Sequence, residues 1–329
     1  MSRPLLYLSA DQVRQCLPMA DAIECARDAF SQISNGSAVL PTRLNVACTT
    51  DGVDLIMPCA SESSRVFSLK TVTVFPGNKQ AGRPTTQGLL ILTDVETGSH
   101  LAIMDGTSLT AIRTGAASGL ATDLLASPTA ESVAILGAGG QARTQLDAVC
   151  QIRPVKQVRV YSPSGESAKA FAAEMSARHG VSVAASNSPE ECVAGADIIC
   201  TATSSLTPVV TDASIQAGAH INAVGAFRPE MAELPPELIC RSQVVVDHVE
   251  SALEEAGDLL QPMEAGMIQQ AHFDTELGDI VTGKVPGRKA PEQITVFKSV
   301  GVAIQDLCAA TRVLENAREQ GLGTPLSHL

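Results

Sequence analysis

The first apolar pattern along the chain has helical spacing. Apolar residues three or four positions apart recur between about residues 11 and 35, and such residues lie on one face of a helix. Ser9 has a side chain that favours a helix start, and Gly36 is a residue type that ends helices. The pattern predicts one helical segment over about 11–35. Its apolar positions are Met19, Ile23, Ala26 and Phe30.

The residue composition changes between residues 43 and 104. Runs rich in β-branched residues (VFSLKTVTVF, GLLILTDV, HLAIM) are broken by Pro76–Gly77 and Thr97–Gly98. Alternating short strands with turn residues between them predict an antiparallel sheet. The following stretch, 107–125, is rich in Ala, Thr and Leu and predicts a closely packed helix that leads from this sheet into a second domain.

From residue 131 the chain alternates short apolar runs with helical segments. The runs SVAIL, QVRVY, VSVAA, ADIICTAT, AGAHINAVG and SQVVVD are each continuous rather than alternating. Strands buried on both faces have this composition, so the fold class predicted is α/β with a Rossmann-type, doubly wound parallel sheet over 119–299. A last amphipathic helix, over 299–319, is expected to pack back on the first domain.

Charge and cysteine content exclude several classes of partner. The formal net charge is -12 and the pI is about 4.9, which argues against nucleic acid or an anionic membrane, because phosphates are held by clustered cations. The nine cysteines contain no CxxC pair, so they are expected to be reduced thiols in a cytoplasmic protein rather than disulfides or metal ligands. We expect no metal, because no cluster of His, Cys and acidic residues has metal-ligand spacing. We expect no membrane span, because no apolar run reaches about 20 residues.

The stretch GAGGQA, residues 137–142, follows an apolar strand and opens a helix. Gly137, Gly139 and Ala142 match G-x-G-x-x-G/A, in which the first glycine permits the turn and the second admits a pyrophosphate. The motif alone is weak, but its strand–turn–helix context predicts dinucleotide binding. An ordinary glycine turn is the alternative.

The second strand of this domain ends at Tyr161-Ser162-Pro163-Ser164. An NAD-preferring site usually has an acid here, and none is present, so the cofactor is predicted as NADPH, NADH or both. Ser162 and Ser164 are candidates to bind a 2'-phosphate. Alternatively, these residues form only a turn, with Glu166 as a charge at the start of the next helix.

Three cations in the first domain are candidates to bind an anionic substrate. Arg43 precedes the sheet, Lys70 lies within the strand VFSLKTVTVF, and Arg113 lies in the helix TAIRTGAASG. Arginine grips carboxylates bidentately, and a buried lysine is a usable acid or base because desolvation lowers its pKa. The competing interpretation is three surface charges, with Lys70 extending to solvent from an edge strand.

Several separated motifs, taken together, carry a resemblance. They are P-T-R at 41–43, S-L-K at 68–70, F-P-G-N at 75–78, T-x-I-R-T-G-A-A-S around Arg113, GAGGQA, and T-V-F-K-S-V-G at 295–301. In this order they resemble the ornithine cyclodeaminase/mu-crystallin family over essentially the whole chain. The resemblance implies a discontinuous α+β domain for substrate binding and dimerisation, residues 1–118 with 300–329, and a homodimer.

The resemblance also implies roles for individual residues. Arg43 and Arg113 would hold a substrate carboxylate, Lys70 would be the catalytic residue, and Phe227 and Gly301 would line the substrate site. The cofactor-binding residues it implies are Thr85, Arg113, Gly137, Gly139, Gly140, Gln141, Ser162, Thr203, Val224, Gly225, Ala226 and Ser299.

The family holds several chemistries, and one position separates them. Cyclodeaminases carry V-G-G-D, whereas this chain has Val224-Gly225-Ala226-Phe227 and so lacks the acid. We therefore predict an NAD(P)H-dependent reductase of a cyclic ketimine acid, giving L-proline or L-pipecolate. The alternatives are an ornithine or lysine cyclodeaminase, an alanine dehydrogenase, and an NADPH-binding protein without turnover.

Other polar residues receive structural interpretations. Glu254, Glu255 and Asp258 are predicted to form a solvated helix face, and His248 is predicted to be structural. Lys298, next to Ser299, is ranked below that serine as a cofactor contact.

Overall fold

The computed structural model describes residues 4–326, and its backbone forms two compact units. Unit 1 comprises the residues up to Arg113 together with those from Val302 onward, and unit 2 comprises Thr114–Gly301. The first boundary falls inside a single helix, α3 (Gly106–Leu125). The sequence-based division at 118/119 and 299/300 differs by a few residues, because no change of composition marks a boundary within a continuous helix.

Unit 1 is built on a mixed sheet whose strands run in the order β15-β1-β7-β6-β5-β4-β2, with β3 paired to β4. The neighbours from β2 to β7 are antiparallel, as predicted, whereas β1 joins β7 in parallel. The strands are β1 (Leu5–Leu8), β2 (Ala38–Val39), β3 (Leu44–Ala47), β4 (Val53–Ser61), β5 (Val66–Val74), β6 (Thr86–Asp94), β7 (His100–Asp105) and β15 (Thr324–Leu326).

The N-terminal helical segment is two helices, not the single one predicted. Helix α1 (Ala10–Cys16) begins with a capping box in which Ser9 and Gln12 bond to each other's backbone, so the predicted helix start is confirmed. Pro18 then separates it from α2 (Met19–Ser34), because proline disfavours helical geometry in the residue before it. Gly36 follows α2 with a positive φ of 67°, which glycine adopts without strain.

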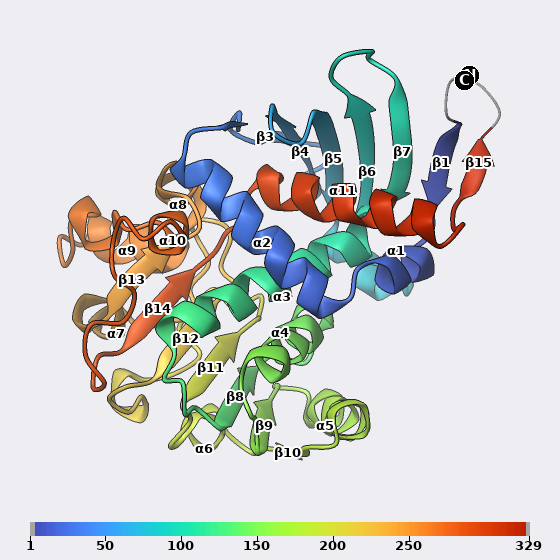
Figure 1. Ribbon diagram of the computed structural model, residues 1–329. Helices are drawn as coiled ribbons and strands as arrows, with labels where there is room; N and C mark the ends of the chain where they lie inside the picture. Colours follow the sequence, from blue (N-terminus) through green and yellow to red (C-terminus); the bar gives the residue numbers. More distant parts are fainter. Residues whose placement is uncertain (1–3, 327–329) are drawn as a thin grey trace. The chain divides into compact units, whose positions relative to one another are not determined.

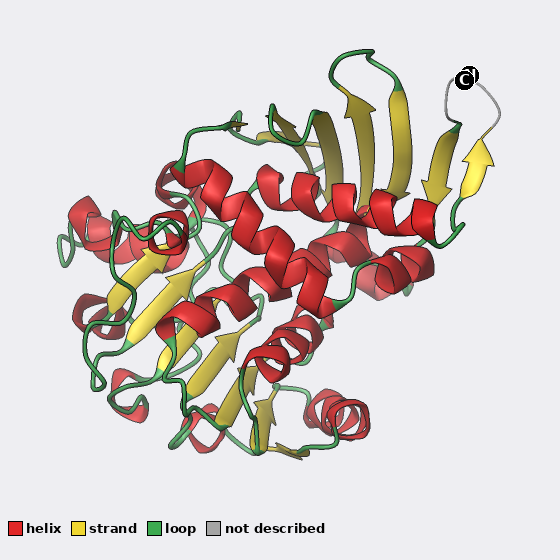
Figure 2. Ribbon diagram, viewed as in Figure 1, coloured by secondary structure: helices red, strands yellow, loops and turns green. Residues whose placement is uncertain are grey.

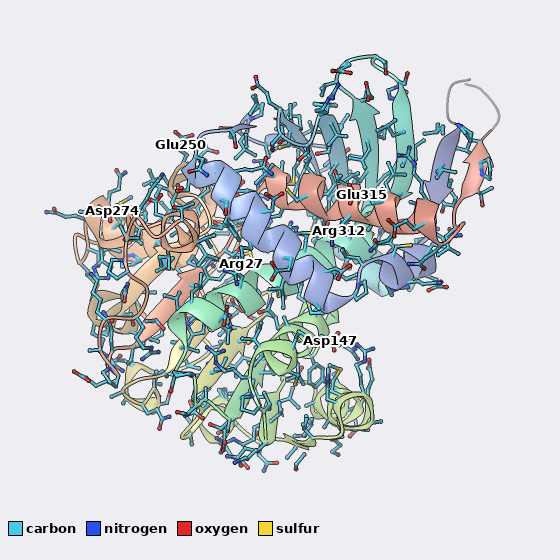
Figure 3. All side chains as sticks on the ribbon, viewed as in Figure 1. Arg27, Asp147, Glu250, Asp274, Arg312 and Glu315 are labelled. Carbon is cyan, nitrogen blue, oxygen red and sulfur yellow. The ribbon has the colours of Figure 1, made fainter. Side chains whose placement is uncertain are left out.

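The C-terminal helix α11 (Ala303–Glu319) packs within unit 1, against α2 and across strands β4 and β5 (Figure 1). Packing on the first domain is thus confirmed, but the helix begins about four residues later than predicted. Its outward surface carries Arg312 and Glu315, which are labelled in Figure 3. They form an ion pair in which Arg312 Nε lies 3.5 Å from Glu315 Oε2. Its inward surface is buried and carries the polar pair Gln305 and Asp306.

Unit 2 contains a parallel sheet with the strand order β10-β9-β8-β11-β12-β14-β13, flanked by helices (Figure 2). The predicted doubly wound α/β architecture is confirmed, with the order of the strands reversing between the parallel neighbours β8 and β11. One strand was missed: β14 inserts between β12 and β13, although it comes last in sequence. The strands are β8 (Ser132–Leu136), β9 (Gln157–Tyr161), β10 (Ser182–Ala185), β11 (Ile198–Thr201), β12 (His220–Ala223), β13 (Gln243–Val246) and β14 (Thr295–Lys298).

Each face of this sheet has its own apolar core. One core joins α4 and α5 to inward residues such as Ile135, Val160 and Cys200, and the other joins α6, α7, α8 and α9 to Leu136, Ile199 and others. Continuous apolar strands arise because both faces must be covered. The helices are α4 (Gly140–Ile152), α5 (Gly165–His179), α6 (Pro189–Val193), α7 (Pro236–Arg241), α8 (Val249–Glu255), α9 (Gly257–Glu264) and α10 (Leu277–Val281). Short 3-10 helices span Pro76–Ala81, Asp212–Ser214 and Gln270–Phe273.

All nine cysteines are unpaired thiols, and most of them are buried, as predicted. Within residues 4–326, no helix combines the length and the apolar character needed to cross a bilayer, and no group of three metal-ligating side chains converges.

Candidate active site

The buried cation Lys70 is the centre of a charged network in unit 1. Its strand, β5, alternates faces, and Lys70 lies on the covered face with only 1% of its surface exposed. Its Nζ donates to Asp306 Oδ2 at 2.5 Å, and the other oxygen of Asp306 accepts from Arg113 Nε at 3.0 Å. The structure thus excludes a lysine that extends to solvent from an edge, and it brings Lys70 and Arg113 onto one carboxylate.

Burial lowers the pKa of Lys70 to about 7, with partial compensation from the charge of Asp306. Its partners across the sheet are Met57 and Leu90, both apolar and buried, so water is replaced by side chains that cannot solvate an ammonium. The charges of Arg113 and Arg43 also contribute to this lowered pKa. A lysine with a pKa near 7 holds and releases a proton at neutral pH, which an ordinary surface lysine does not.

Arg113 is oriented from two sides by helix α11. Its Nη1 donates to Gln305 Oε1 at 2.9 Å while its Nε is held by Asp306, so the plane of the guanidinium is fixed. Arg43, just before β3, is half-buried, and its charge acts on Lys70. Arg113, Arg43 and Lys70 bring positive charges close enough to affect one another, which suits an anionic ligand.

Thr85, which the resemblance places near the cofactor, lies immediately before β6 and is half-buried. Its carbonyl accepts from the Phe75 N–H at 2.8 Å, which closes the loop that contains F-P-G-N. This contact fixes the backbone of the loop and does not use the Thr85 hydroxyl.

The glycine turn after β8 in unit 2 has the shape that a pyrophosphate needs. Gly137 has a φ of 104°, and a Cβ there would lie 2.5 Å from the carbonyl oxygen of Ala202, so only glycine fits. At Gly139 and Gly140 a Cβ would meet no protein atom within 4 Å. The open space lies over the start of α4, where backbone N–H groups attract anions. Gln141 Oε1 is buried there without a hydrogen-bond partner among residues 4–326.

The end of β9 supports two of the sequence interpretations. Ser162 is half-buried at the carboxyl end of the strand, and Ser164 caps α5 by accepting from the Ser167 N–H. Glu166 lies in the first turn of α5 and pairs with Lys169, as the helix-start interpretation predicts. Because the Ser164 hydroxyl is committed to the cap, Ser162 is the more available hydroxyl at this edge.

Glu233, a residue that the sequence did not single out, organises the loops after β11 and β12. Its carboxylate accepts from Thr201 Oγ1 at 2.7 Å, from the Thr203 N–H at 2.6 Å and from the Gly225 N–H at 2.7 Å. Burial raises its pKa, and the charge of Asp258 adds to the effect. A Cβ on Gly225 would collide with this carboxylate and with the carbonyl of Thr203, so the glycine is required by Glu233.

The predicted solvated acidic helix face is wrong. Asp258 and Glu255 are buried, and Glu254 alone of the three is exposed. Asp258 accepts from the N–H groups of Glu233 and Leu234 and pairs with Lys298 Nζ at 2.8 Å, with both side chains wholly buried. The role considered for Lys298 as a cofactor contact is therefore replaced by an internal ion pair beneath the loops.

Asp247, at the end of β13, holds the segment after β14. Its Oδ2 accepts from Ser299 Oγ at 2.7 Å and from the N–H groups of Val300 and Gly301 at 2.9 and 2.7 Å. Gly301 has a φ of 84°. This backbone turn ends the strand and delays α11, and it commits the hydroxyl proton of Ser299, leaving its oxygen to accept from a ligand. His248 bonds to Ser251, in keeping with a structural role.

The predicted cofactor residues of unit 2 therefore gather at one edge of its sheet. Gly137, Ser162, Thr203, Val224–Ala226 and Ser299 follow β8, β9, β11, β12 and β14, all of which run parallel. The predicted substrate residues Phe227 and Gly301 follow β12 and β14 at the same edge. Ligands of doubly wound sheets bind at the carboxyl ends of the strands, near the point where strand order reverses.

The opposite edge of the same sheet has a pocket lined by Arg153 and Arg288. Its position is far from the expected chemistry, and both of these arginines already donate to backbone carbonyls. Arg153 donates to the carbonyls that end α3, and Arg288 donates to those of Leu125, Pro291 and Gln293. Nearby, burial lowers the pKa of His220 to about 3, so this histidine is neutral. We interpret this edge as structural.

Comparison with known proteins agrees with the motifs. The profile of the ornithine cyclodeaminase/mu-crystallin family matches residues 5–321. A Delta(1)-pyrroline-2-carboxylate reductase of Bacillus cereus is 40% identical over 321 residues, covering 97% of this chain and 98% of that protein.

Two solved structures share the fold over nearly the whole chain. The Thermococcus litoralis Delta(1)-pyrroline-2-carboxylate reductase in complex with NADH and L-proline matches with a TM-score of 0.95 and 40% identity, over 98% of this chain and 100% of that one. An archaeal alanine dehydrogenase dimer with bound NAD matches with a TM-score of 0.94 and 32% identity, over 99% and 100%. The chain belongs to the ornithine cyclodeaminase/mu-crystallin family.

Proposed function

We propose that the protein is an NAD(P)H-dependent reductase that converts Δ1-pyrroline-2-carboxylate to L-proline, or the six-membered analogue to L-pipecolate. The observation that carries the proposal is the Lys70–Asp306–Arg113 network, which combines a titrating proton donor with a carboxylate-binding cation. The relatives named as pyrroline-2-carboxylate reductases support the same substrate class.

Unit 1 supplies the substrate-binding side of the reaction. Arg43 and Arg113 hold the carboxylate, and Lys70 donates a proton to the imine nitrogen. A reduced nicotinamide, when bound, supplies the hydride for the imine carbon. The proton and the hydride together account for the two hydrogens added across C=N. Lys70 is left neutral, and its pKa near 7 lets it recover a proton from solvent at physiological pH.

Unit 2 holds the dinucleotide at the carboxyl edge of its sheet. Gly139 and Gly140 leave room for the pyrophosphate, and Ser162 reaches the adenosine ribose. A hydroxyl at this position can accept a hydrogen bond from a ribose hydroxyl or donate one to a 2'-phosphate, whereas an acid would repel the phosphate. This supports use of NADPH as well as NADH. Thr203, Val224–Ala226 and Ser299 line the remainder of the cofactor.

Deamination of an amino acid is the less suited chemistry, because it needs a base where this chain has Phe227. The neighbouring Glu233 does not replace that base. All three of its hydrogen-bond donors belong to the protein, and its carboxylate is fully buried beneath Gly225. The aromatic ring of Phe227 instead contacts Arg228, whose guanidinium lies 5.9 Å from the ring centroid.

The test is a steady-state assay of NADH and NADPH oxidation with both cyclic imines. We expect turnover with at least one imine and little response to pyruvate plus ammonia. A faster reaction with pyruvate and ammonia would assign an alanine dehydrogenase instead. Tight NADPH binding without turnover on any imine would assign a binding protein, and NAD-dependent release of ammonia from L-ornithine would assign a cyclodeaminase.

We further propose that two copies associate through the open face of the unit 1 sheet. The outward residues Pro58, Leu69, Ile91 and Ile103 pair in register across β4, β5, β6 and β7, forming an apolar row. Apolar side chains that lie side by side on an open sheet face are typical of an interface, and a dimer of an archaeal relative supports the proposal.

Light scattering tests the association. Leu69→Glu places a charge in the middle of the row and is expected to halve the mass. Gln320→Glu, which adds the same charge at the end of α11, is expected to leave it unchanged. Equal masses for wild type and Leu69→Glu would refute this interface. We also propose a cytoplasmic location, which the unpaired thiols support.

A further inference from the structure

Gln305, on helix α11, lies in the charged network but has an unused donor. Its Oε1 accepts from Arg113 Nη1 at 2.9 Å and from the Val302 N–H at 3.1 Å. Because both partners are donors, the oxygen is identified and the amide cannot be flipped. Its Nε2 is therefore fixed beside that oxygen, on the same amide plane.

The Nε2 group of Gln305 has no hydrogen-bond partner within residues 4–326, although it is buried. The side chain as a whole is only 2% exposed. Buried polar groups are almost always bonded, because a donor taken out of water without an acceptor loses its hydration with no return. An acceptor is thus missing at this point.

The surroundings define the chemistry of the missing acceptor. The same amide oxygen touches Arg113, whose Nε is bound to Asp306, which in turn holds Lys70. The one carboxylate of this network, Asp306, is already shared by two cations. An amide N–H and a guanidinium both only donate hydrogen bonds. The ligand group that best matches the two together is therefore a carboxylate, which accepts from both.

We propose that Gln305 is a specificity-determining residue whose Nε2 donates to the substrate carboxylate alongside Arg113. The proposal deepens the proposed function and rests on it for the identity of the substrate. Helix α11 then contributes two residues to the site. Asp306 sets the charge of Lys70, and Gln305 binds the carboxylate of the ligand. Imines without a carboxylate would leave the donor unmatched.

Gln305→Glu is the sharpest test, because it keeps the oxygen that Arg113 and Val302 use and replaces the donor with a second, negatively charged oxygen. KM for Δ1-pyrroline-2-carboxylate is expected to rise about 10- to 100-fold, the range for a lost charge-assisted hydrogen bond. KM for 1-pyrroline, which lacks the carboxylate, is expected to stay within about twofold. Gln320→Glu, with the same change at the end of the same helix, controls for added charge.

A binding measurement makes the test independent of turnover. Calorimetry with pyrrole-2-carboxylate and with pyrrole is expected to show that wild type prefers the acid and that Gln305→Glu loses this preference. Equal KM increases for both imines, or unchanged binding of the acid, would overturn the proposal and leave a water molecule as the partner of Nε2. If wild type binds the acid yet reduces no imine, the proposed function fails while Gln305 keeps its role. If wild type binds neither ligand, both proposals fail.

Discussion

Replacing Asp306 by asparagine removes the negative charge that keeps Lys70 protonated. The carboxylate lies 2.5 Å from Lys70 Nζ. Its charge raises the pKa of Lys70 against the larger effect of burial, and the net value is about 7. Asparagine keeps the size and one oxygen but leaves burial and the charges of Arg113 and Arg43, all of which lower the pKa. The Lys70 pKa is therefore expected to fall.

The size of the fall follows from the usual effect of a close opposite charge. Such a charge shifts a pKa by about 1–3 units, so Lys70 in Asp306→Asn would titrate at about 4–6. At pH 8 the protonated fraction would drop from about one in ten to between about one in 100 and one in 10,000. Because only protonated Lys70 donates to the imine, kcat/KM at pH 8 should fall about 10- to 1,000-fold. The loss should shrink as the pH is lowered.

The assay is the pH profile of kcat/KM from pH 5 to 9, with imine and cofactor. The basic limb, near pH 7 in wild type, should move to lower pH in Asp306→Asn. Asp94→Asn, at the last residue of β6, is the matched control and should leave the limb in place. If the variant lost activity equally at every pH, Asp306 would hold geometry without setting the charge of Lys70, and the reasoning would be refuted.

Three further predictions concern stability and cofactor binding. Gly225→Ala should lower the free energy of unfolding, because its Cβ meets a buried carboxylate. Gly139→Ala, whose Cβ enters open space, should leave it unchanged. Urea unfolding measures both, and equal midpoints for the two variants would contradict the prediction. Asp247→Asn should weaken NADH binding about tenfold by releasing Ser299 and its neighbours, as measured by cofactor fluorescence; unchanged affinity would remove this role. Lys70 has a folded pKa below its unfolded value, so the unfolded chain binds more protons above pH 7. Wild-type stability should then rise relative to Lys70→Met by about 1.4 kcal/mol per pH unit between pH 7 and 9, and parallel stability curves in urea would exclude the shift.

Much of the fold was accessible from local patterns. Continuous apolar runs predicted the parallel sheet because strands covered on both faces need them, and the glycine turn after β8 was predicted from its spacing. Local patterns missed two features of the fold, the break in the first helical segment and strand β14, for different reasons. Pro18 divides the first helical segment, and β14 was overlooked because its four residues follow a long irregular stretch and pair only with strands distant in sequence.

Charged residues were the least predictable, since a charge pattern does not reveal whether its members reach solvent. Asp258 looked like part of a solvated helix face, yet it lies in the interior with Lys298. Nothing in the residues around Glu233 indicated a special role for it, although its carboxylate accepts hydrogen bonds from the loops after two strands. Sequence did indicate Lys70, because a lysine within a β-branched run is unusual, but it could not name the partner.

The sequence by itself determined the residue types of the chemistry and the local shape of each motif: a glycine turn, a lysine within a β-strand, an arginine in a small-residue helix. Tertiary structure alone decided which of these meet. Asp306 is 236 positions from Lys70 and reaches it only because α11 returns to pack on the sheet of unit 1. The physical reason is that local conformation depends on neighbours within a few residues, whereas the pKa of Lys70 depends on what burial brings against it.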